Sequence, residues 1–403
     1  MAGVLAAVVS STNAVAAESA GSSDWDSFIK DGKASLSFRY RFEHVDDNRF
    51  SDDADASTVR TRLSIASGRV KGFQLFTEFD NVSQIGADDY NAGGGNTPSM
   101  GGYPVIADPE GSELNQLYLD YKAGNFGARV GRQRINLDNQ RFVGGVGWRQ
   151  NEQTYDAVKF EYTGDGFDAR YAYINKVRRI LGDQVSAGIH DQDGTHLLNA
   201  GVDLGSVGRL AAYYYRLDNE DAFAFSTSTF GARFKGSVAL GDDVKIRYEG
   251  EFARQTDAGD NPADYDANYT HLNGGVIVGK VDVGVGWEAL GGDEDDPGEA
   301  FRTPFATLHA FNGFADQFLA TPDAGLEDRY VKVKFTPDAW IAEARYHSFE
   351  ADDGSEEFGE ELNLRLGYKF NKWVRADAFY ADFDGDGSRP DVDKFWLMVS
   401  VAF

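Results

Sequence analysis

The chain lacks several features that define other protein classes. It contains no cysteine, which excludes disulfide frameworks, thiolate metal sites and cysteine nucleophiles. No apolar run approaches the roughly 18 to 20 residues of a membrane-spanning helix. Excess positive charge is also missing: the net charge of −26 argues against nucleic acid as a partner, because phosphate binding needs clustered Lys and Arg.

Proline is scarce, whereas glycine and aromatic residues are abundant. The 403 residues include 9 prolines and 46 glycines, and 13% of them are aromatic. Proline interrupts strand pairing, while glycine supports tight turns, so this balance suits a long antiparallel meander. The composition therefore favours an all-β fold.

The first residues resemble an export signal. A short apolar stretch after Met1 reaches a small-x-small sequence at Ala14 to Ala16, which is typical of a signal-peptide cleavage site. No Lys or Arg precedes Lys30, so the basic start of such a signal is missing or truncated, and an alanine-rich tail is the alternative. We expect a signal peptide over residues 1–17, a periplasmic segment over 18–32 and a transmembrane barrel over 33–403.

Apolar and polar side chains alternate along stretches of about ten residues from Lys33 onward. The first stretch has Leu36 and Phe38 on one face and Arg39 and Arg41 on the other. About eighteen such stretches follow one another, joined alternately by tight turns and long polar loops. This pattern predicts an antiparallel up-and-down β-barrel that spans a membrane and turns its apolar face toward lipid.

The C-terminal stretch supports this membrane assignment. It places Phe395, Leu397 and Val399 on one face and ends on the aromatic residue Phe403. It resembles the C-terminal insertion signal of outer-membrane proteins, which implies the barrel-assembly machinery as a partner. We therefore expect the protein in the bacterial outer membrane.

Four closely spaced motifs resemble the signature stretch of the alginate-export family. They read Gly131-Arg-Gln-Arg-Ile135, Gln140-Arg-Phe-Val-Gly144, Trp148-Arg-Gln-Asn151 and Thr154-Tyr-Asp-Ala-Val158. The resemblance implies an outer-membrane barrel of eighteen strands whose Arg-rich lumen passes an anionic polysaccharide. Many members look like porins of unassigned solute, so alginate itself does not follow from the family.

Basic side chains recur on the polar faces of the predicted strands, where they would line the lumen. They are Arg39, Arg41, Arg60, Arg62, Arg233, Lys235, Lys245, Arg247, Arg345, Arg365 and Arg375. Guanidinium ladders of this kind guide carboxylate or phosphate groups, which predicts a channel for polar, anionic saccharide-type solutes. Acids share the same faces: Glu43, Glu78, Asp80, Asp120, Glu161, Asp168, Glu249, Glu251, Glu343 and Glu361. A general small-solute porin, whose arginines only satisfy these acids, is the alternative.

The predicted connection from Asn136 to Gln153 carries Arg141, Trp148 and Arg149. Folded into the barrel, it would narrow the pore, and its indole and guanidinium groups would suit sugar rings and sugar carboxylates. Packed on the rim, Trp148 would instead anchor the loop at the membrane interface. The sequence leaves both arrangements open.

A run of aspartates near the C-terminus fits the spacing of a calcium loop. Asp382, Asp384 and Asp386 alternate around a glycine turn, and Asp393 occupies the twelfth position. Calcium is the one cofactor that the sequence suggests, and none is required by the barrel. A solvated hairpin turn is the alternative.

Signals of catalysis are absent from the sequence. No two of the 6 histidines have the helical spacing of metal ligands, and no serine lies in a nucleophile-elbow pattern. We therefore expect a channel and no enzymatic activity. A receptor or enzyme that acts through the long outer loops is the less favoured alternative.

Overall fold

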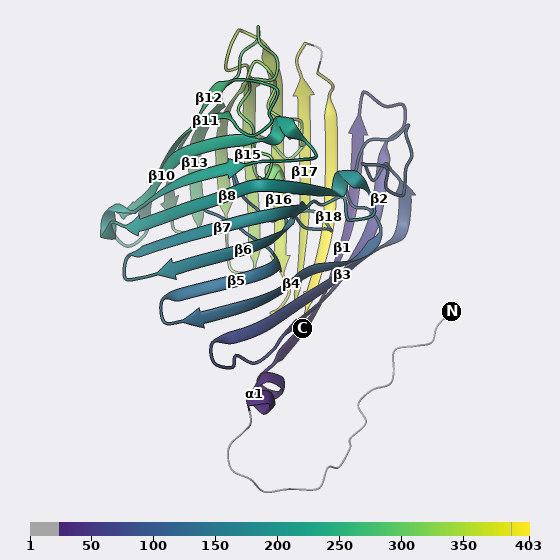
Figure 1. Ribbon diagram of the computed structural model, residues 1–403. Helices are drawn as coiled ribbons and strands as arrows, with labels where there is room; N and C mark the ends of the chain where they lie inside the picture. Colours follow the sequence, from purple (N-terminus) through teal and green to yellow (C-terminus); the bar gives the residue numbers. More distant parts are fainter. Residues whose placement is uncertain (1–23, 388) are drawn as a thin grey trace, which may run out of the picture.

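The computed structural model describes residues 24–387 and 389–403, so the expected signal peptide lies outside the described residues. Eighteen antiparallel strands form one sheet, and each strand pairs with its neighbours along the chain. The sheet closes because β1 (Lys33–Asp47) pairs with β18 (Val392–Ala402) (Figure 1). The predicted all-β barrel and its strand number are confirmed.

The intervening strands follow the predicted stretches closely. They are β2 (Ala54–Ala66), β3 (Phe73–Asp89), β4 (Gly111–Ala123), β5 (Phe126–Gln133), β6 (Thr154–Thr163), β7 (Phe167–Arg178), β8 (Ile189–Asp203), β9 (Arg209–Leu217), β10 (Thr227–Ala239), β11 (Val244–Asp257), β12 (Asp266–Val278), β13 (Val281–Leu290), β14 (Leu326–Phe335), β15 (Trp340–Glu350), β16 (Glu357–Lys369) and β17 (Val374–Gly385).

The helices are short. Helix α1 (Asp24–Lys30) precedes the barrel, and single turns lie in the connections: η1 (Ser186–Gly188), η2 (Gly205–Val207), η3 (Phe223–Phe225) and η4 (Leu308–Ala310). Among the described residues, no helix is long and apolar enough to cross a membrane.

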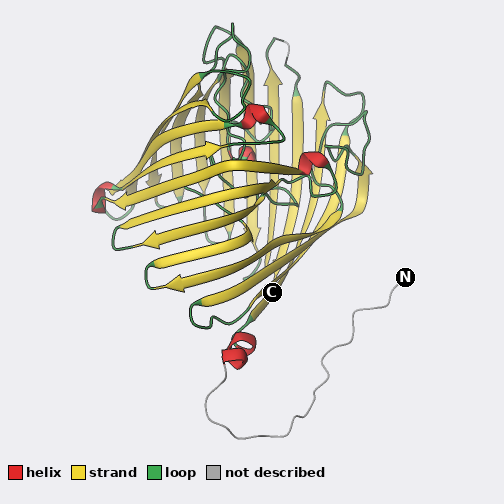
Figure 2. Ribbon diagram, in the orientation of Figure 1, coloured by secondary structure: helices red, strands yellow, loops and turns green. Residues whose placement is uncertain are grey.

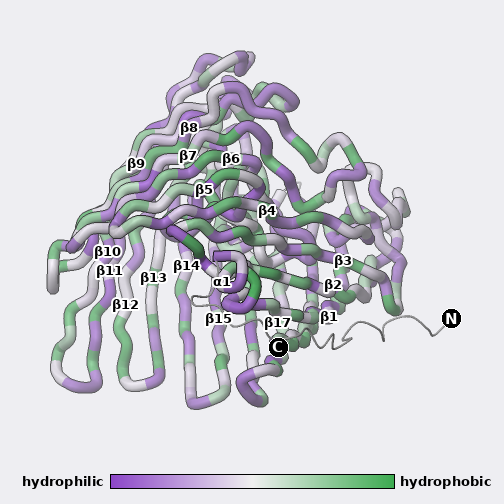
Figure 3. Tube along the Cα trace, turned by 60° about the horizontal axis from the view of Figure 1, so that its bottom comes forward, coloured by the Kyte–Doolittle hydropathy of each residue, from purple (hydrophilic) through white to green (hydrophobic). Residues whose placement is uncertain are grey.

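Side chains alternate between the two faces of the barrel wall. Outward positions such as Leu63, Val285 and Val331 are apolar and exposed, whereas inward positions such as Arg41 and Glu43 are polar and buried. The alternation of hydrophobic and hydrophilic residues is visible along the strands in Figure 3. An outward apolar band matches the hydrocarbon of a bilayer, and inward polar groups can meet water or each other.

Short turns and long connections occupy opposite ends of the barrel. Helix α1 and the C-terminus lie at the short-turn end (Figures 1 and 2). The longest connections, residues 90–110, 134–153 and 291–325, start from the other end. This is the arrangement expected of periplasmic turns and external loops.

Gly131 in β5 shows why one predicted motif needs its glycine. Its φ is +120°, and a Cβ there would lie 2.3 Å from the carbonyl oxygen of Leu117 on the paired strand β4. No other residue fits this conformation and this close approach. The strand ends two residues later, at Gln133, where the connection 134–153 begins.

The two faces of β14 give a direct test of the barrel assignment. Val331 faces outward near the middle of the strand, and the adjacent Lys332 faces the lumen. We expect Val331→Arg to lower the free energy of unfolding by about 2–4 kcal/mol, because it places a charge in hydrocarbon. Lys332→Arg is the matched control and should change it by less than about 0.5 kcal/mol. Urea unfolding in lipid vesicles measures both, and equal effects would contradict the assignment.

Candidate functional site

Two long connections fold into the barrel and meet inside it. They are loop 134–153, between β5 and β6, and loop 291–325, between β13 and β14. Val143 and Phe305 form a parallel β-bridge, and the amide of Gly144 donates to the carbonyl oxygen of Phe305 (2.8 Å). The amide of Val146 donates to Thr307 Oγ1 (3.2 Å). Loop 134–153 therefore takes the inward arrangement of the two that the sequence left open.

Arginines of β1 hold the tip of loop 134–153. Arg39 donates to the carbonyl oxygen of Gly147 (2.8 Å) and to Gln150 Oε1 (3.0 Å). Arg41 donates to the carbonyl oxygen of Trp148 (2.6 Å). These side chains lie inside the barrel as predicted, but their hydrogen-bond donors are directed to the loop.

Arginines of β2 converge on one carboxylate of the same loop. Glu152 is 2.9 Å from Arg62 and 3.4 Å from Arg60, and it also pairs with Arg134. A second carboxylate, Asp80 of β3, lies 2.5 Å from Arg62. Burial alone would raise the pKa of Glu152, but the charges of Arg62, Arg134 and Arg60 outweigh it and lower this pKa to about 2. Glu152 is therefore ionised at neutral pH.

Glu43 anchors the middle of the constriction. Its carboxylate lies 2.8 Å from both Arg41 and Arg149. Asp108, from the connection 90–110, lies 3.2 Å from Arg41. Arg149 reaches across to Asp316 of loop 291–325 (3.4 Å). The predicted basic ladder is therefore largely neutralised by buried ion pairs, as in the alternative in which the arginines satisfy neighbouring acids.

An aromatic cluster joins the two loops to the wall. The ring of Trp148 stacks on His309 of loop 291–325 with centroids 3.8 Å apart, and it contacts Phe379 of β17 and Trp396 of β18 edge-on. Burial lowers the pKa of His309, although Asp316 lies 2.8 Å from its Nδ1 and opposes this shift. A neutral imidazole can stack on the indole without the cost of burying a charge.

Arg141 ties loop 134–153 to the far wall. This side chain is buried, and it donates to Glu288 of β13 (2.8 Å) and to Asn312 of loop 291–325 (3.0 Å). A buried guanidinium with this many protein partners is held in place and is not available to a solute.

The remaining predicted lumen arginines also have carboxylate partners. The pairs are Arg233 with Glu249 (2.8 Å), Arg247 with Asp282 (2.9 Å), Arg345 with Glu343 (2.6 Å), Arg365 with Asp377 (3.0 Å) and Arg375 with Asp377 (2.6 Å). Lys235 and Lys245 are exposed on the same face, and no ion pair joins them to any other described residue.

The structure brings the predicted calcium residues together only in part. Asp382 and Asp384 lie in β17, where alternate carboxylates are about 6.5 Å apart along the strand. Asp382 is directly opposite Asp393 on β18. The clusters that could hold a metal ion within the described part of the chain lie elsewhere and contain none of these residues. Asp386 follows β17 in the connection to β18, so the expected loop is divided between a paired strand and this connection.

A cavity of about 620 Å³ lies above the constriction, among the long connections. Its apolar lining includes Phe50, Pro104, Val105, Ile180, Phe225 and Leu308. Four cations reach it: Arg49, Arg149, Arg179 and Lys394. We refer to this space as the outer cavity.

Arg179 differs from the other cations of the outer cavity. Arg49, Arg149 and Lys394 all have carboxylates within 4.0 Å. Arg179 has none in residues 24–387 and 389–403, and burial lowers its pKa. Sequence reasoning missed Arg179, because it stands in a polar connection where neither periodicity nor a motif distinguishes it.

Comparison with known proteins identifies the family and the fold. The alginate export family matches residues 33–294 of this chain. No curated protein sequence matches it.

Among solved structures, Pseudomonas aeruginosa OccK3 (OpdO) is 16% identical with a TM-score of 0.71, and the match covers 94% of this chain and 97% of that one. Acinetobacter baumannii OccAB2 is also 16% identical, with a TM-score of 0.73 and coverage of 94% and 99%. Pseudomonas aeruginosa OpdK with vanillate is 14% identical, with a TM-score of 0.71 and coverage of 93% and 99%.

Removing the charge of Glu152 should loosen loop 134–153. Glu152→Gln leaves Arg60 and Arg134 without their shared carboxylate, which weakens loop attachment by about 2–3 kcal/mol. We expect larger and noisier single-channel currents in planar bilayers. The control is Glu161→Gln, which removes a wall carboxylate that pairs with Lys159 (3.0 Å) and should leave the currents quiet. Quiet currents in both variants would show that this ion-pair cluster does not hold the loop.

The pH dependence of the same contact follows from the lowered pKa. The pKa of Glu152 is about 2 in the folded protein and 4.5 ordinarily. The contribution of its charge to the attachment of loop 134–153 is therefore complete above about pH 4.5 and is lost as the pH falls toward 2. The difference in current noise between the unaltered protein and Glu152→Gln should therefore stay constant from about pH 7 to 4.5. It should then shrink on further acidification. A difference that disappears already at about pH 6 would assign the effect to another group.

Proposed function

Since the chain belongs to the alginate export family and is an outer-membrane channel, we propose that it admits small organic anions with an apolar or ring-shaped body. The observation that carries this proposal is the guanidinium of Arg179, which has no carboxylate partner among the described residues, in an outer cavity with many apolar lining residues. A desolvated cation without a carboxylate partner favours an anion that brings its own charge. The apolar lining favours a solute that also has hydrophobic surface.

The constriction supports a small solute over a continuous polysaccharide chain. Loops 134–153 and 291–325 are bridged to each other inside the barrel and tied to its wall by buried ion pairs. A polymer would need both loops to leave the lumen, which breaks these pairs. Trp148, predicted to stack on sugar rings, is stacked on His309 instead, and the guanidinium carbon of Arg41 lies 4.4 Å from the centroid of its ring. We assign Trp148 to the packing of the constriction.

Unpaired cations continue below the constriction. Lys235, Lys245 and Lys332 face the lumen, and no carboxylate of the described residues forms an ion pair with any of them. Charges inside a narrow lumen act on a solute more strongly than the acids of the external loops, which lie in screened solvent. These lysines thus take the role that the sequence gave to Arg39, Arg41, Arg60 and Arg62.

A general small-solute porin is the second candidate, and the extensive ion pairing of the wall arginines favours it. The two candidates differ in saturation: a binding channel is blocked by its solute at a defined concentration, and a general porin is not. Catalysis has no place in either candidate.

Block by vanillate tests the proposed site. We expect anion preference in the reversal potential under a salt gradient, and concentration-dependent block by vanillate added on the loop side. Arg179→Gln should weaken this block about 10-fold to 100-fold, because a charge-assisted hydrogen bond contributes about 1.5–3 kcal/mol.

The matched control is Arg216→Gln. Arg216 is also near the loop end but pairs with Asp218 (3.1 Å) and does not line the outer cavity, so its loss should leave the block unchanged. Cation preference in the unaltered channel would overturn the anion proposal. If Arg179→Gln leaves the block by vanillate unchanged, the binding site lies elsewhere in the channel.

A further inference from the structure

Three metal-ligand side chains converge on the lumen wall at β11 and β12, away from the outer cavity. Glu251 and His271 are directly opposite each other on the two strands, and Glu249 lies two residues from Glu251 on the same face of β11. Each of the three can place one ligand atom within 4.8 Å of the other two. The paired strands therefore bring together two carboxylates and one imidazole.

Each of these side chains is fixed through one atom by a neighbouring group. Oε1 of Glu249 accepts two hydrogen bonds from Arg233 (2.8 and 2.9 Å). Oε1 of Glu251 accepts one from the hydroxyl of Tyr213 (2.8 Å). Nε2 of His271 lies 3.2 Å from the hydroxyl of Tyr330. Outer partners of this kind orient the ligands of metal sites.

In Glu251 and His271, the second possible ligand atom is buried and has no hydrogen-bond partner among the described residues. Glu251 is 3% exposed and His271 is 9% exposed. Oε2 of Glu251 and Nδ1 of His271 make no hydrogen bond with any described residue, although Arg233 Nε lies 3.5 Å from the first and Glu249 Oε1 lies 3.6 Å from the second. Leaving such atoms unsatisfied is costly, and a cation between them would satisfy both.

We propose that Glu249, Glu251 and His271 bind a divalent transition-metal ion such as Zn²⁺. Two carboxylates and one guanidinium leave the cluster with a net negative charge, which a divalent cation offsets. An imidazole nitrogen beside carboxylate oxygens suits Zn²⁺, Mn²⁺ or Fe²⁺ better than Ca²⁺ or Mg²⁺, which prefer oxygen ligands alone. Three protein ligands also leave a coordination position for water or a solute.

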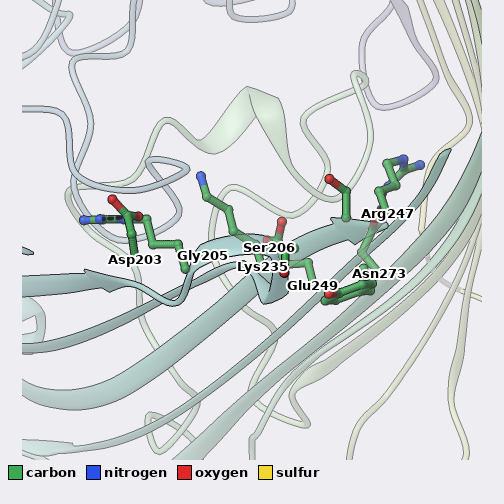
Figure 4. Close-up of a pocket in the computed structure, with 12 residues that line it drawn as sticks. Asp203, Gly205, Ser206, Lys235, Arg247, Glu249 and Asn273 are labelled. Carbon is green, nitrogen blue, oxygen red and sulfur yellow. Dashed lines mark hydrogen bonds and ion pairs between the residues drawn. The ribbon is translucent and has the colours of Figure 1, made fainter. Parts of the chain in front are cut away.

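A water-accessible route leads to the cluster. Glu249 lines a cavity of about 610 Å³ near the short turn between β8 and β9, together with Lys235, Arg247 and Asn273 (Figure 4). An ion can therefore reach Glu249 from the short-turn end of the lumen. This site is separate from Arg179, so it does not depend on the proposed function.

Titration calorimetry of the detergent-solubilised barrel with Zn²⁺ tests the proposal. The unaltered protein should bind one Zn²⁺ at this site, and Glu251→Gln and His271→Ala should each weaken binding at least 10-fold. Co²⁺ should show visible d–d absorption that changes in His271→Ala, which reports the imidazole ligand. Heat-modifiable migration on gels verifies that each variant is folded. If Glu251→Gln does not fold, His271→Ala alone tests the site.

The matched control is Glu299→Gln in the other acidic cluster, Asp293, Asp296 and Glu299 of loop 291–325. This change should leave Zn²⁺ binding unaltered. The proposal is overturned if the unaltered barrel binds no Zn²⁺. It is equally overturned if the folded Glu251→Gln and His271→Ala variants bind as tightly as the unaltered protein, or if binding is lost in Glu299→Gln instead.

Discussion

The hydrogen bonds between β1 and β18 are the constraint on which the rest of this structure depends. A bilayer offers no water to the backbone, so every unpaired amide or carbonyl group in hydrocarbon costs several kcal/mol. A sheet satisfies all of them only when its first and last strands pair, as they do here from Ser37 opposite Ala402 to Asp47 opposite Val392. Closure fixes the inward and outward faces of every strand, and with them the position of each charged side chain.

Closure also creates an interior that must accommodate charge. The inward faces carry many acids and bases, and burying a charge without a partner is far more costly than burying an ion pair. The chain meets this requirement by folding two connections inward, so that Glu152 and Arg149 complete the ion pairs of β1 and β2. Several arginines that the sequence suggests for solute binding form contacts that hold loop 134–153 against the barrel wall. The cations that we propose to be available to a solute, such as Arg179, have no carboxylate partner among the described residues.

The barrel could be predicted from the sequence because its signal is local. Alternation along a strand decides that Arg39 and Arg41 face inward while Phe38 faces outward, and this requires no knowledge of distant residues. The partners could not be predicted in the same way. Arg39 meets Gln150 across 111 positions, and no pattern in either segment specifies that contact.

The calcium prediction depended on spacing along the chain alone. The spacing of Asp382, Asp384 and Asp386 fits a loop, but β17 extends to Gly385 and separates the carboxylates that a loop would gather. The cluster of Glu249, Glu251 and His271 was missed because β11 and β12 had to be paired in register before His271 could lie opposite Glu251. Such sites depend on tertiary register, which a single sequence does not specify.

The bridge between Val143 and Phe305 has a mechanical consequence. Loop 134–153 is attached to β1 and β2 at one side and, through Arg141, to β13 at another, and it is joined to loop 291–325 between them. A hollow cylinder in a bilayer resists flattening only through the bending stiffness of its wall. A tie across the interior couples distant parts of the circumference, so lateral compression of one side is transmitted to the other. The same contacts that narrow the lumen thus brace its cross-section against the lateral pressure of the surrounding lipid.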